Sequence, residues 1–216
     1  MMHKLENQII EIDGIFAPNY DNHINEWKKT KKFFNSNNID DLLEVIGDKK
    51  IKRSLDIGGW IGLWSLELSK ISEQVELFEP NKLHMLCAEK NLSKVSNVNF
   101  HNFATGNDHK TVGMSYRNKG HTGTFSVTSH EGDIQCIPID SFNFDDVDLV
   151  KIDVEGYELF VLEGMVSTIK KCKPIIQIEY NGNTKYWDQP KKLIHDFLTS
   201  LGLERKVKNW PDCIYQ

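Results

Sequence analysis

The amino-acid sequence predicts an α/β fold in which helices cover both faces of a doubly wound, mostly parallel sheet of seven strands. Three observations lead to this prediction. Short apolar runs alternate with segments of helical periodicity from about residue 52 onward. The connections are only a few residues long, as in right-handed β-α-β units. A chain of 216 residues, 39% of them hydrophobic, is long enough for one such domain around one core.

Residues 1–50 are expected to form an N-terminal helical extension that could act as a lid over a site. Isoleucines alternate near its start, and helical segments follow. The clearest of these segments, residues 40–46, ends just before Gly47, as a short helix would. Three residues recur at helical spacing and could form either one packing face or part of the lid: Tyr20, His23 and Trp27.

Residues 51–216 are expected to form the main domain, in which strands and helices alternate. The expected strands are residues 54–57, 75–78, 98–103, 149–154 and 174–180, with short edge strands near 204–207 and 213–215. The expected helices are residues 61–71, 83–95, 157–171 and 191–201. Residues 104–140 break the rhythm, because they are rich in polar residues and glycine and hold short strand-like pieces. They are expected to form an inserted β-hairpin region that could supply one wall of a substrate site.

Composition and charge disfavour several classes of protein. The formal net charge is −5, and the sequence has no dense basic block of the kind that nucleic-acid-binding proteins carry. No stretch approaches the roughly 20 apolar residues of a membrane-spanning helix, and the first residues do not resemble a secretory signal. The four cysteines form no CxxC pair, so neither a disulfide framework nor a zinc site is expected. These observations predict a cytoplasmic protein that binds no nucleic acid and spans no membrane.

Glycines and acidic residues stand at the ends of the first two expected strands, where ligands bind in an open parallel sheet. The first strand ends near Asp56, and Gly58, Gly59 and Gly62 follow it, which allows a tight turn and a close approach of the backbone to a ligand. The second strand ends in Glu79, 23 positions after Asp56. An acidic side chain at that distance can accept hydrogen bonds from both hydroxyls of an adenosyl ribose.

Two classes of cofactor fit this arrangement. Dinucleotide-binding enzymes use the spacing G-x-G-x-x-G to hold a pyrophosphate at a helix N-terminus, and the three glycines here do not have that spacing. S-adenosylmethionine has no phosphate and carries an ammonium group, and Asp56 at a strand end suits that group or an ordered water near it. The sequence therefore favours S-adenosylmethionine, and a nicotinamide-dependent oxidoreductase is the alternative.

Three blocks of the sequence resemble the FkbM-type methyltransferases, and the resemblance extends over residues 54–202. The first block is LDIGGWIG at residues 55–62 and the second is FEP at residues 78–80. The third and most specific block contains KIDVEGYE at residues 151–158. The resemblance implies a class I methyltransferase domain with a Rossmann-like fold and S-adenosylmethionine as the cofactor. It also implies that the acceptor is a hydroxyl oxygen of a sugar, a glycan or another small molecule.

One position departs from the family pattern. Trp60 stands where the family usually has an asparagine that orders the loop. The indole could reshape the methionine end of the cofactor pocket, or it could pack under the N-terminal extension. A catalytically degenerate domain that still holds the cofactor is therefore a further alternative.

The candidate catalytic residues are Asp153, Glu155 and Glu179, at the ends of the fourth and fifth expected strands. Lys151, Asp153 and Glu155 alternate along one expected strand and would point to one face. Asp153 is expected near the transferred methyl group, where it could both shape the cofactor site and take the proton of the acceptor hydroxyl. In the alternative interpretation, Glu155 caps the next helix and Glu158 interacts with its first turn.

Further candidates follow the third and fifth expected strands. Asn102 and Phe103 are expected beside the adenine, and Tyr180 and Asn181 on the acceptor side. Carboxylates at these strand ends could imitate a divalent-metal site, but the pattern is weak and no metal is predicted. Two histidines of the inserted region are weaker candidates for a general base: His121 and His130.

Overall fold

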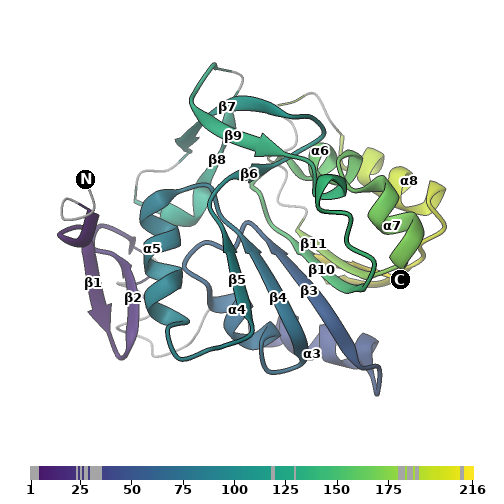
Figure 1. Ribbon diagram of the computed structural model, residues 1–216, viewed down its shortest axis with the longest axis horizontal. Helices are drawn as coiled ribbons and strands as arrows, with labels where there is room; N and C mark the ends of the chain where they lie inside the picture. Colours follow the sequence, from purple (N-terminus) through teal and green to yellow (C-terminus); the bar gives the residue numbers. More distant parts are fainter. Residues whose placement is uncertain are drawn as a thin grey trace.

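The computed structural model describes residues 5–22, 24, 26, 29, 36–117, 120–128, 130–179, 183, 187, 190–209 and 212–216. At its centre is a seven-stranded sheet with the order β12-β13-β11-β10-β3-β4-β5 (Figure 1). The strands are β3 (Ile51–Ile57), β4 (Ser72–Phe78), β5 (Val98–His101), β10 (Val147–Ile152), β11 (Ile175–Glu179), β12 (Arg205–Asn209) and β13 (Asp212–Tyr215). From β3 the chain builds the sheet first to one side and then to the other. This reversal leaves a crevice at the carboxyl ends of β3 and β10, where α/β domains bind ligands.

The sheet is mixed, with a parallel main part and an antiparallel edge. β5, β4, β3, β10 and β11 pair in parallel with one another. β13 runs antiparallel to β11 on one side and to β12 on the other. The expectation of a mostly parallel sheet therefore holds for five adjacent strands, whereas the last two strands of the chain form an antiparallel pair at the edge.

Helices cover both faces of this sheet and create two hydrophobic layers. One face carries α6 (Glu158–Glu163), α7 (Val166–Cys172) and α8 (Lys191–Ser200), and the other carries α3 (Ser36–Ile46), α4 (Leu63–Leu68) and α5 (Lys82–Asn91). Successive residues of β10 enter different layers: Val150 belongs to the cluster of Leu162 and Leu198, and Leu149 to the cluster of Leu68. Burial on both faces explains the unbroken apolar runs of the parallel strands. In the part of the chain that the structure describes, every helix is too short or too polar to span a bilayer.

The helix predicted over residues 157–171 is interrupted, so this prediction is wrong in its middle: the segment forms α6 and α7. Gly164 lies so close to another segment that a Cβ atom there would be 1.9 Å from the carbonyl oxygen of Gly106. The Gly164 carbonyl oxygen accepts a hydrogen bond from Asp140 N (2.9 Å). The Asp140 carboxylate accepts hydrogen bonds from Thr168 N (2.8 Å) and Thr168 Oγ1 (2.8 Å) at the start of α7. A side chain distant in sequence therefore caps α7 and stabilises the break.

The inserted region forms a second, smaller sheet with the order β6-β9-β7-β8, at one end of the main sheet (Figure 1). Its strands are β6 (Ala104–Thr105), β7 (Lys110–Tyr116), β8 (Phe125–Thr128) and β9 (Ile134–Ile137). β7 pairs antiparallel with both β8 and β9, so the expected β-hairpin is present. The other expected strands and helices of the main domain are present with ends that differ by up to four residues.

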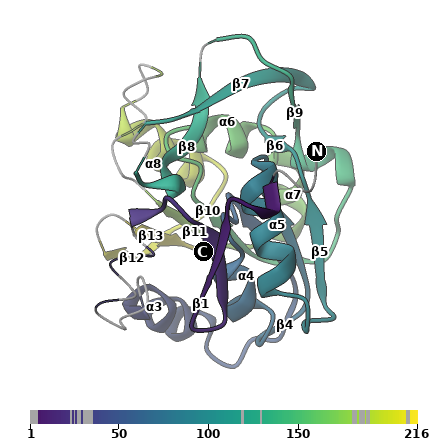
Figure 2. The same ribbon diagram turned by 90° about the vertical axis from the view of Figure 1, so that its left-hand side faces the viewer.

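The N-terminal extension begins as a β-hairpin, which the prediction of a helical extension did not include. β1 (Ile9–Ile12) and β2 (Ile15–Pro18) are antiparallel, and Asp13 and Gly14 between them are both left-handed, with φ of 51° and 83°. The hairpin lies against α5 (Figure 2). There the Asn91 side chain accepts a hydrogen bond from Phe16 N (2.7 Å) and donates one to Phe16 O (2.9 Å). The expected helix at residues 40–46 is the second part of α3.

Candidate active site

A cavity of about 500 Å³ lies at the carboxyl ends of four strands of the main sheet. Gly58 and Glu79 line it from the ends of β3 and β4, and Asp153 and Glu179 line it from the ends of β10 and β11. The other walls come from the inserted region and the N-terminal extension: Met114, Thr124, Phe125, Val127, Ile24 and Glu26. The volume is in the range of small-molecule sites, and the position is the switch point of the strand order.

The glycine loop after β3 packs against three other elements. At Gly58 (φ 83°), a Cβ atom would lie 1.8 Å from the Asp153 carbonyl oxygen, so only glycine fits beside β10. At Gly59 the nearest atom would be Leu77 Cγ, at 2.6 Å, and at Gly62 the nearest would be Leu92 Cδ1, at 2.9 Å, directly after α5. Of these three glycines, only Gly58 lines the cavity. Gly59 and Gly62 position the loop by close packing.

Asp56 lies beneath the loop and does not line the cavity. It is fully buried, and its Oδ2 accepts a hydrogen bond from Ser65 Oγ of α4 (2.6 Å). Burial raises the pKa of Asp56, and the neighbouring Lys151 opposes that rise. The position suits a role in holding α4 against β3 more than the expected contact with the cofactor ammonium group or a water near it.

Glu79 is a cavity carboxylate held in place by the backbone around it. Its Oε2 accepts a hydrogen bond from Trp60 N (3.0 Å), and its Oε1 accepts one from Asn81 N (2.8 Å). Asn102 lies outside the cavity lining and donates its side-chain N–H to the Glu79 carbonyl oxygen (2.8 Å), so it supports this strand end from behind. Phe103 lines the cavity, where an aromatic face could contact an adenine.

Three carboxyl groups gather where β10 and β11 end. One oxygen atom of each of Asp153, Glu155 and Glu179 lies within 4.8 Å of the others. Burial raises the pKa of Glu179, and the charges of Asp153 and Glu155 raise it further. Glu179 is hydrogen-bonded to Asp153, and its raised pKa means that Glu179 keeps its proton. The buried Lys151 faces the other side of the pair, with its Nζ 3.1 Å from Asp153 Oδ2.

A sharp turn follows Asp153 and separates it from Glu155. β10 ends one residue before Asp153, so the predicted alternation along one strand as far as Glu155 is wrong. Glu155 and Gly156 both have positive φ, 57° and 106°. The Glu155 carbonyl oxygen accepts a hydrogen bond from Arg117 Nη2 (3.0 Å), which ties the inserted region to this turn. The turn brings Glu155 into the cavity lining together with Asp153.

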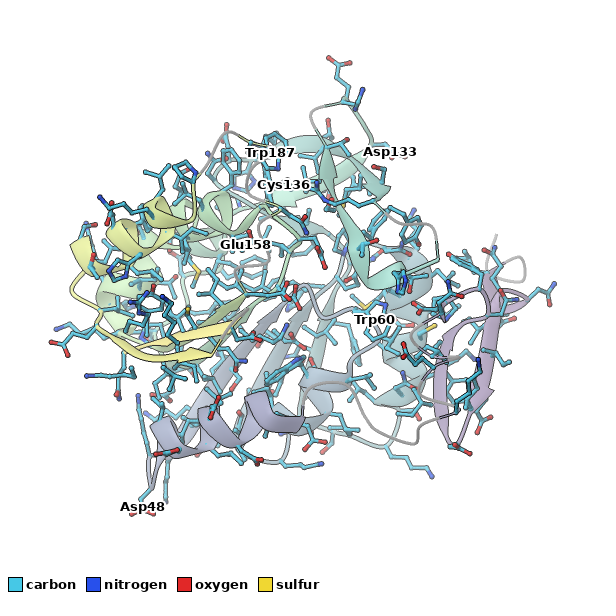
Figure 3. All side chains as sticks on the ribbon, turned by 180° about the vertical axis from the view of Figure 1, so that it is seen from behind. Asp48, Trp60, Asp133, Cys136, Glu158 and Trp187 are labelled. Atoms are coloured by element: carbon cyan, nitrogen blue, oxygen red, sulfur yellow. The ribbon has the colours of Figure 1, made fainter. Side chains whose placement is uncertain are left out.

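Glu158 supports the same turn from inside the protein. It is fully buried, and its Oε1 accepts a hydrogen bond from Gly156 N (2.8 Å). Burial raises the pKa of Glu158 to about 7. Glu158 lies on the side of α6, whereas Trp60 lies toward the N-terminal hairpin (Figure 3). The hydrogen bond from Gly156 N to Glu158 agrees with the alternative interpretation, in which Glu158 interacts with the backbone near the first turn of the helix.

Trp60 connects three segments that are distant in sequence. Its Nε1 donates a hydrogen bond to Thr122 Oγ1 (3.0 Å), and Thr122 donates from both N (3.0 Å) and Oγ1 to Asp21 Oδ2. We call these three residues the closure contact. The indole lines the cavity and packs against the cluster that contains Ile12 and Ile24, so it packs against the N-terminal extension. Trp60 has a positive φ of 46°, a conformation that asparagine adopts more readily.

Sequence reasoning missed several residues that line the cavity: His84, Met114, Phe125, Val127 and Tyr157. They come from helix starts and from an irregular insertion, where no periodic pattern marks a site. The two loop histidines considered as bases do not line it: His121 and His130. Four residues named in the predictions lie outside the described part of the chain: His23, Trp27, Tyr180 and Asn181.

Solved structures with a similar fold include several methyltransferases. The FkbM methyltransferase of Methylobacillus flagellatus KT superposes with a TM-score of 0.54 at 20% identity, over 77% of this chain and 43% of that one. This chain therefore spans less than half the length of that protein. The precorrin-6y C5,15-methyltransferase of Geobacter metallireducens GS-15 matches with a TM-score of 0.51 at 14% identity, over 86% and 89% of the two chains. A proposed methyltransferase of Streptococcus mutans, solved in complex with S-adenosylhomocysteine, has a TM-score of 0.51 at 10% identity, over 85% and 97%.

The sequence itself matches one family model over most of its length. Residues 50–205 match the model described as the methyltransferase FkbM domain. A search of curated proteins returns no match. The family model begins where β3 begins and includes the glycine loop, Glu79 and the three clustered carboxyl groups. The chain belongs to the FkbM family of methyltransferases.

Proposed function

We propose that this protein is an S-adenosylmethionine-dependent O-methyltransferase that acts on a hydroxyl group of a sugar, a glycan or another small molecule. One observation carries the proposal: a single cavity is lined by the carboxylate of Glu79 and by the carboxyl pair of Asp153 and Glu179. Family membership supports methyl transfer. The Streptococcus mutans protein of similar fold, with S-adenosylhomocysteine bound, supports the choice of cofactor.

The residues along the cavity fit the adenosyl part of S-adenosylmethionine. Glu79 can accept hydrogen bonds from ribose hydroxyls, and Phe103 offers an aromatic face to the adenine. Gly58 lets the backbone approach the ligand closely. His84 adds a buried ring nitrogen, Nε2, to which no described residue is hydrogen-bonded. The carboxylate of Glu79 and the imidazole of His84, which lie side by side in the cavity, suit a neutral nucleoside better than a pyrophosphate.

The clustered carboxyl groups supply the chemistry that the protein must contribute. When bound, S-adenosylmethionine would supply a methyl group on a sulfonium: the bond from this carbon to the acceptor oxygen forms as the C–S bond breaks, and the sulfur leaves with the electron pair. Alignment of the acceptor is then the main task of the protein. Asp153 takes the proton of the attacking hydroxyl, and Glu179, which holds its own proton, orients Asp153. Glu155 accepts a hydrogen bond from a second hydroxyl of the acceptor.

The acceptor side of the cavity favours an uncharged, hydroxyl-rich molecule. The carboxylates of Asp153 and Glu155 would repel an anion, and the three carboxyl groups can accept hydrogen bonds from several hydroxyls. Met114 and Val127 of the inserted region offer apolar surface for the carbon skeleton. We propose that no metal ion is required, because the buried Lys151 already supplies a positive charge beside Asp153.

We further propose that residues 51–216 form the methyltransferase domain and that residues 1–50 close over the cavity as a lid. Ile24 and Glu26 of the extension line the cavity, and the closure contact joins Asp21 to the inserted region. The four cysteines form no disulfide bond with one another, which supports a cytoplasmic location. The net charge of −5 supports an acceptor other than nucleic acid.

Titration calorimetry with S-adenosylhomocysteine tests this function. Wild-type protein should bind the ligand, and Glu79→Ala should weaken binding at least about tenfold through loss of the ribose contact. Turnover of a panel of sugars should continue after dialysis against a chelator. Tighter binding of NADH than of S-adenosylhomocysteine would favour an oxidoreductase instead. Binding of the cofactor without turnover of any hydroxyl acceptor would favour a degenerate domain.

A further inference from the structure

His84 is fixed beside Glu79 although the proposed chemistry gives it no role. It lines the cavity, yet only 1% of its surface is exposed. It lies in the first turn of α5, where the Asn81 side chain caps the helix and accepts a hydrogen bond from His84 N (3.3 Å). Tyr116 and Phe125 of the inserted region contact the ring edge-on, with centroid distances of 6.1 Å and 6.0 Å. Packing therefore holds the imidazole in one orientation.

The two ring nitrogens of His84 have different surroundings. Nδ1 lies 3.4 Å from Glu79 Oε1, and the carboxylate favours a proton on Nδ1. With the proton there, Nε2 is a hydrogen-bond acceptor. Nε2 is buried, and no residue in the described part of the chain is hydrogen-bonded to it. An unpartnered buried polar atom costs stability, so a ligand in the cavity is the natural partner for Nε2.

The acceptor capacity of Glu79 is partly used by the protein itself. One of its oxygens accepts from Asn81 N and the other from Trp60 N, so the protein uses part of the capacity of the carboxylate. His84 lines the same wall and its Nδ1 lies beside Glu79, so the unpartnered Nε2 of the same ring offers a second acceptor close to this carboxylate. Neighbouring hydroxyls on one sugar ring match neighbouring acceptors.

We propose that His84 is a second nucleoside-binding residue, whose Nε2 accepts a hydrogen bond from one ribose hydroxyl of the cofactor while Glu79 accepts from the other. The proposal rests on the proposed function, because it takes the ligand at this end of the cavity to be S-adenosylmethionine. It adds a contact from the start of α5 to those made by the strand ends.

Three substitutions of His84 separate the roles of its two nitrogens. His84→Phe keeps the ring packing and removes both nitrogens, His84→Asn keeps a polar group near Nδ1, and His84→Gln keeps one near Nε2. Calorimetry with S-adenosylhomocysteine should show about tenfold weaker binding for His84→Phe and His84→Asn, the loss of one hydrogen bond. His84→Gln should stay within about threefold of wild type. His109→Phe, at an exposed histidine, is the matched control and should bind normally.

Ribose analogues identify the atom that His84 contacts. His84 contacts either the 2′ or the 3′ hydroxyl under this proposal. Wild type should bind the deoxy analogue that lacks this hydroxyl about tenfold more weakly than S-adenosylhomocysteine itself, and His84→Phe should bind that analogue as tightly as wild type does. The proposal is overturned if folded His84→Phe binds S-adenosylhomocysteine as tightly as wild type does. It is also overturned if His84→Asn binds with wild-type affinity and His84→Gln does not. The Asn and Gln variants decide the question if His84→Phe does not fold. Failure of wild type to bind at all overturns the proposed function, whereas loss in Glu79→Ala but not in the His84 variants overturns this inference alone.

Discussion

Glu158 is a fully buried carboxyl group, and its burial makes folding stability depend on pH. Its pKa is about 7 in the folded protein, against an ordinary value of 4.5. The folded state therefore keeps a proton that the unfolded chain releases, and this contribution to stability falls as pH rises from about 4.5 to about 7. We expect Glu158→Gln to remove this pH-dependent loss of about 3 kcal/mol. The free energy of unfolding of the variant should therefore rise relative to that of wild type between pH 4.5 and pH 8. Urea unfolding at both pH values measures the gain, and Glu89→Gln, at an exposed site, should show none.

Asp153 is the proposed general base, and its replacement should separate chemistry from binding. Asp153→Asn keeps the size of the side chain but cannot take a proton. We expect turnover to fall by about 10²-fold or more, the usual contribution of a general base, while S-adenosylhomocysteine binds within about threefold of wild type. Steady-state kinetics and calorimetry measure the two effects, with the exposed Asp108→Asn as the control. Unchanged turnover would remove Asp153 from the mechanism.

Side-chain direction decided which predicted residues reached the cavity. The sequence placed glycines and acids at strand ends, and six of the predicted residues line the cavity: Gly58, Glu79, Phe103, Asp153, Glu155 and Glu179. Asp56 does not, because it is the last residue but one of β3 and points toward Ser65 on one face of the sheet. Its position in the strand was predictable, but the helix above that face was needed to show that it is buried.

At the scale of elements, α7 depends on a cap from outside its own sequence. Asp140 accepts hydrogen bonds from Thr168 N and Oγ1, both at 2.8 Å. We expect Asp140→Ala to lower the free energy of unfolding by about 1–2 kcal/mol, the typical cost of losing an N-cap. Chemical denaturation checks this value. Asp145→Ala, at a carboxylate that is 74% exposed, should change stability by no more than about 0.5 kcal/mol.

Periodicity predicted elements well where burial alone shapes them and failed where a distant contact intervenes. The parallel strands were found because both of their faces are buried. The break at Gly164 was missed, since apolar spacing continues through it and only the carbonyl of Gly106 reveals the close approach. The N-terminal hairpin was predictable, because Asp13-Gly14 between alternating apolar residues is a strong turn signal.

At the scale of the whole molecule, the cavity is enclosed by segments that no local pattern brings together. The closure contact joins Asp21 to Thr122, 101 residues away, and Thr122 to Trp60, 62 residues away. A second contact of the same kind joins the hydroxyls of Tyr20 and Tyr116 (3.2 Å). The strand ends could be inferred from sequence because the fold places them together. The insertion and the extension were expected beside the site, but their individual wall residues could not be identified, because these depend on how the two segments meet.

If the extension acts as a lid, loss of the closure contact should speed release of the cofactor. Asp21→Ala leaves the buried N–H and hydroxyl of Thr122 without their acceptor, which costs about 1–3 kcal/mol of stability. We expect S-adenosylhomocysteine to dissociate about tenfold faster, with little change in its association rate. Stopped-flow measurements give both rates, and Asp48→Ala, whose side chain projects into solvent at the far end of the molecule (Figure 3), is the control. Lower stability with unchanged dissociation would mean that the contact stabilises the fold without closing the site.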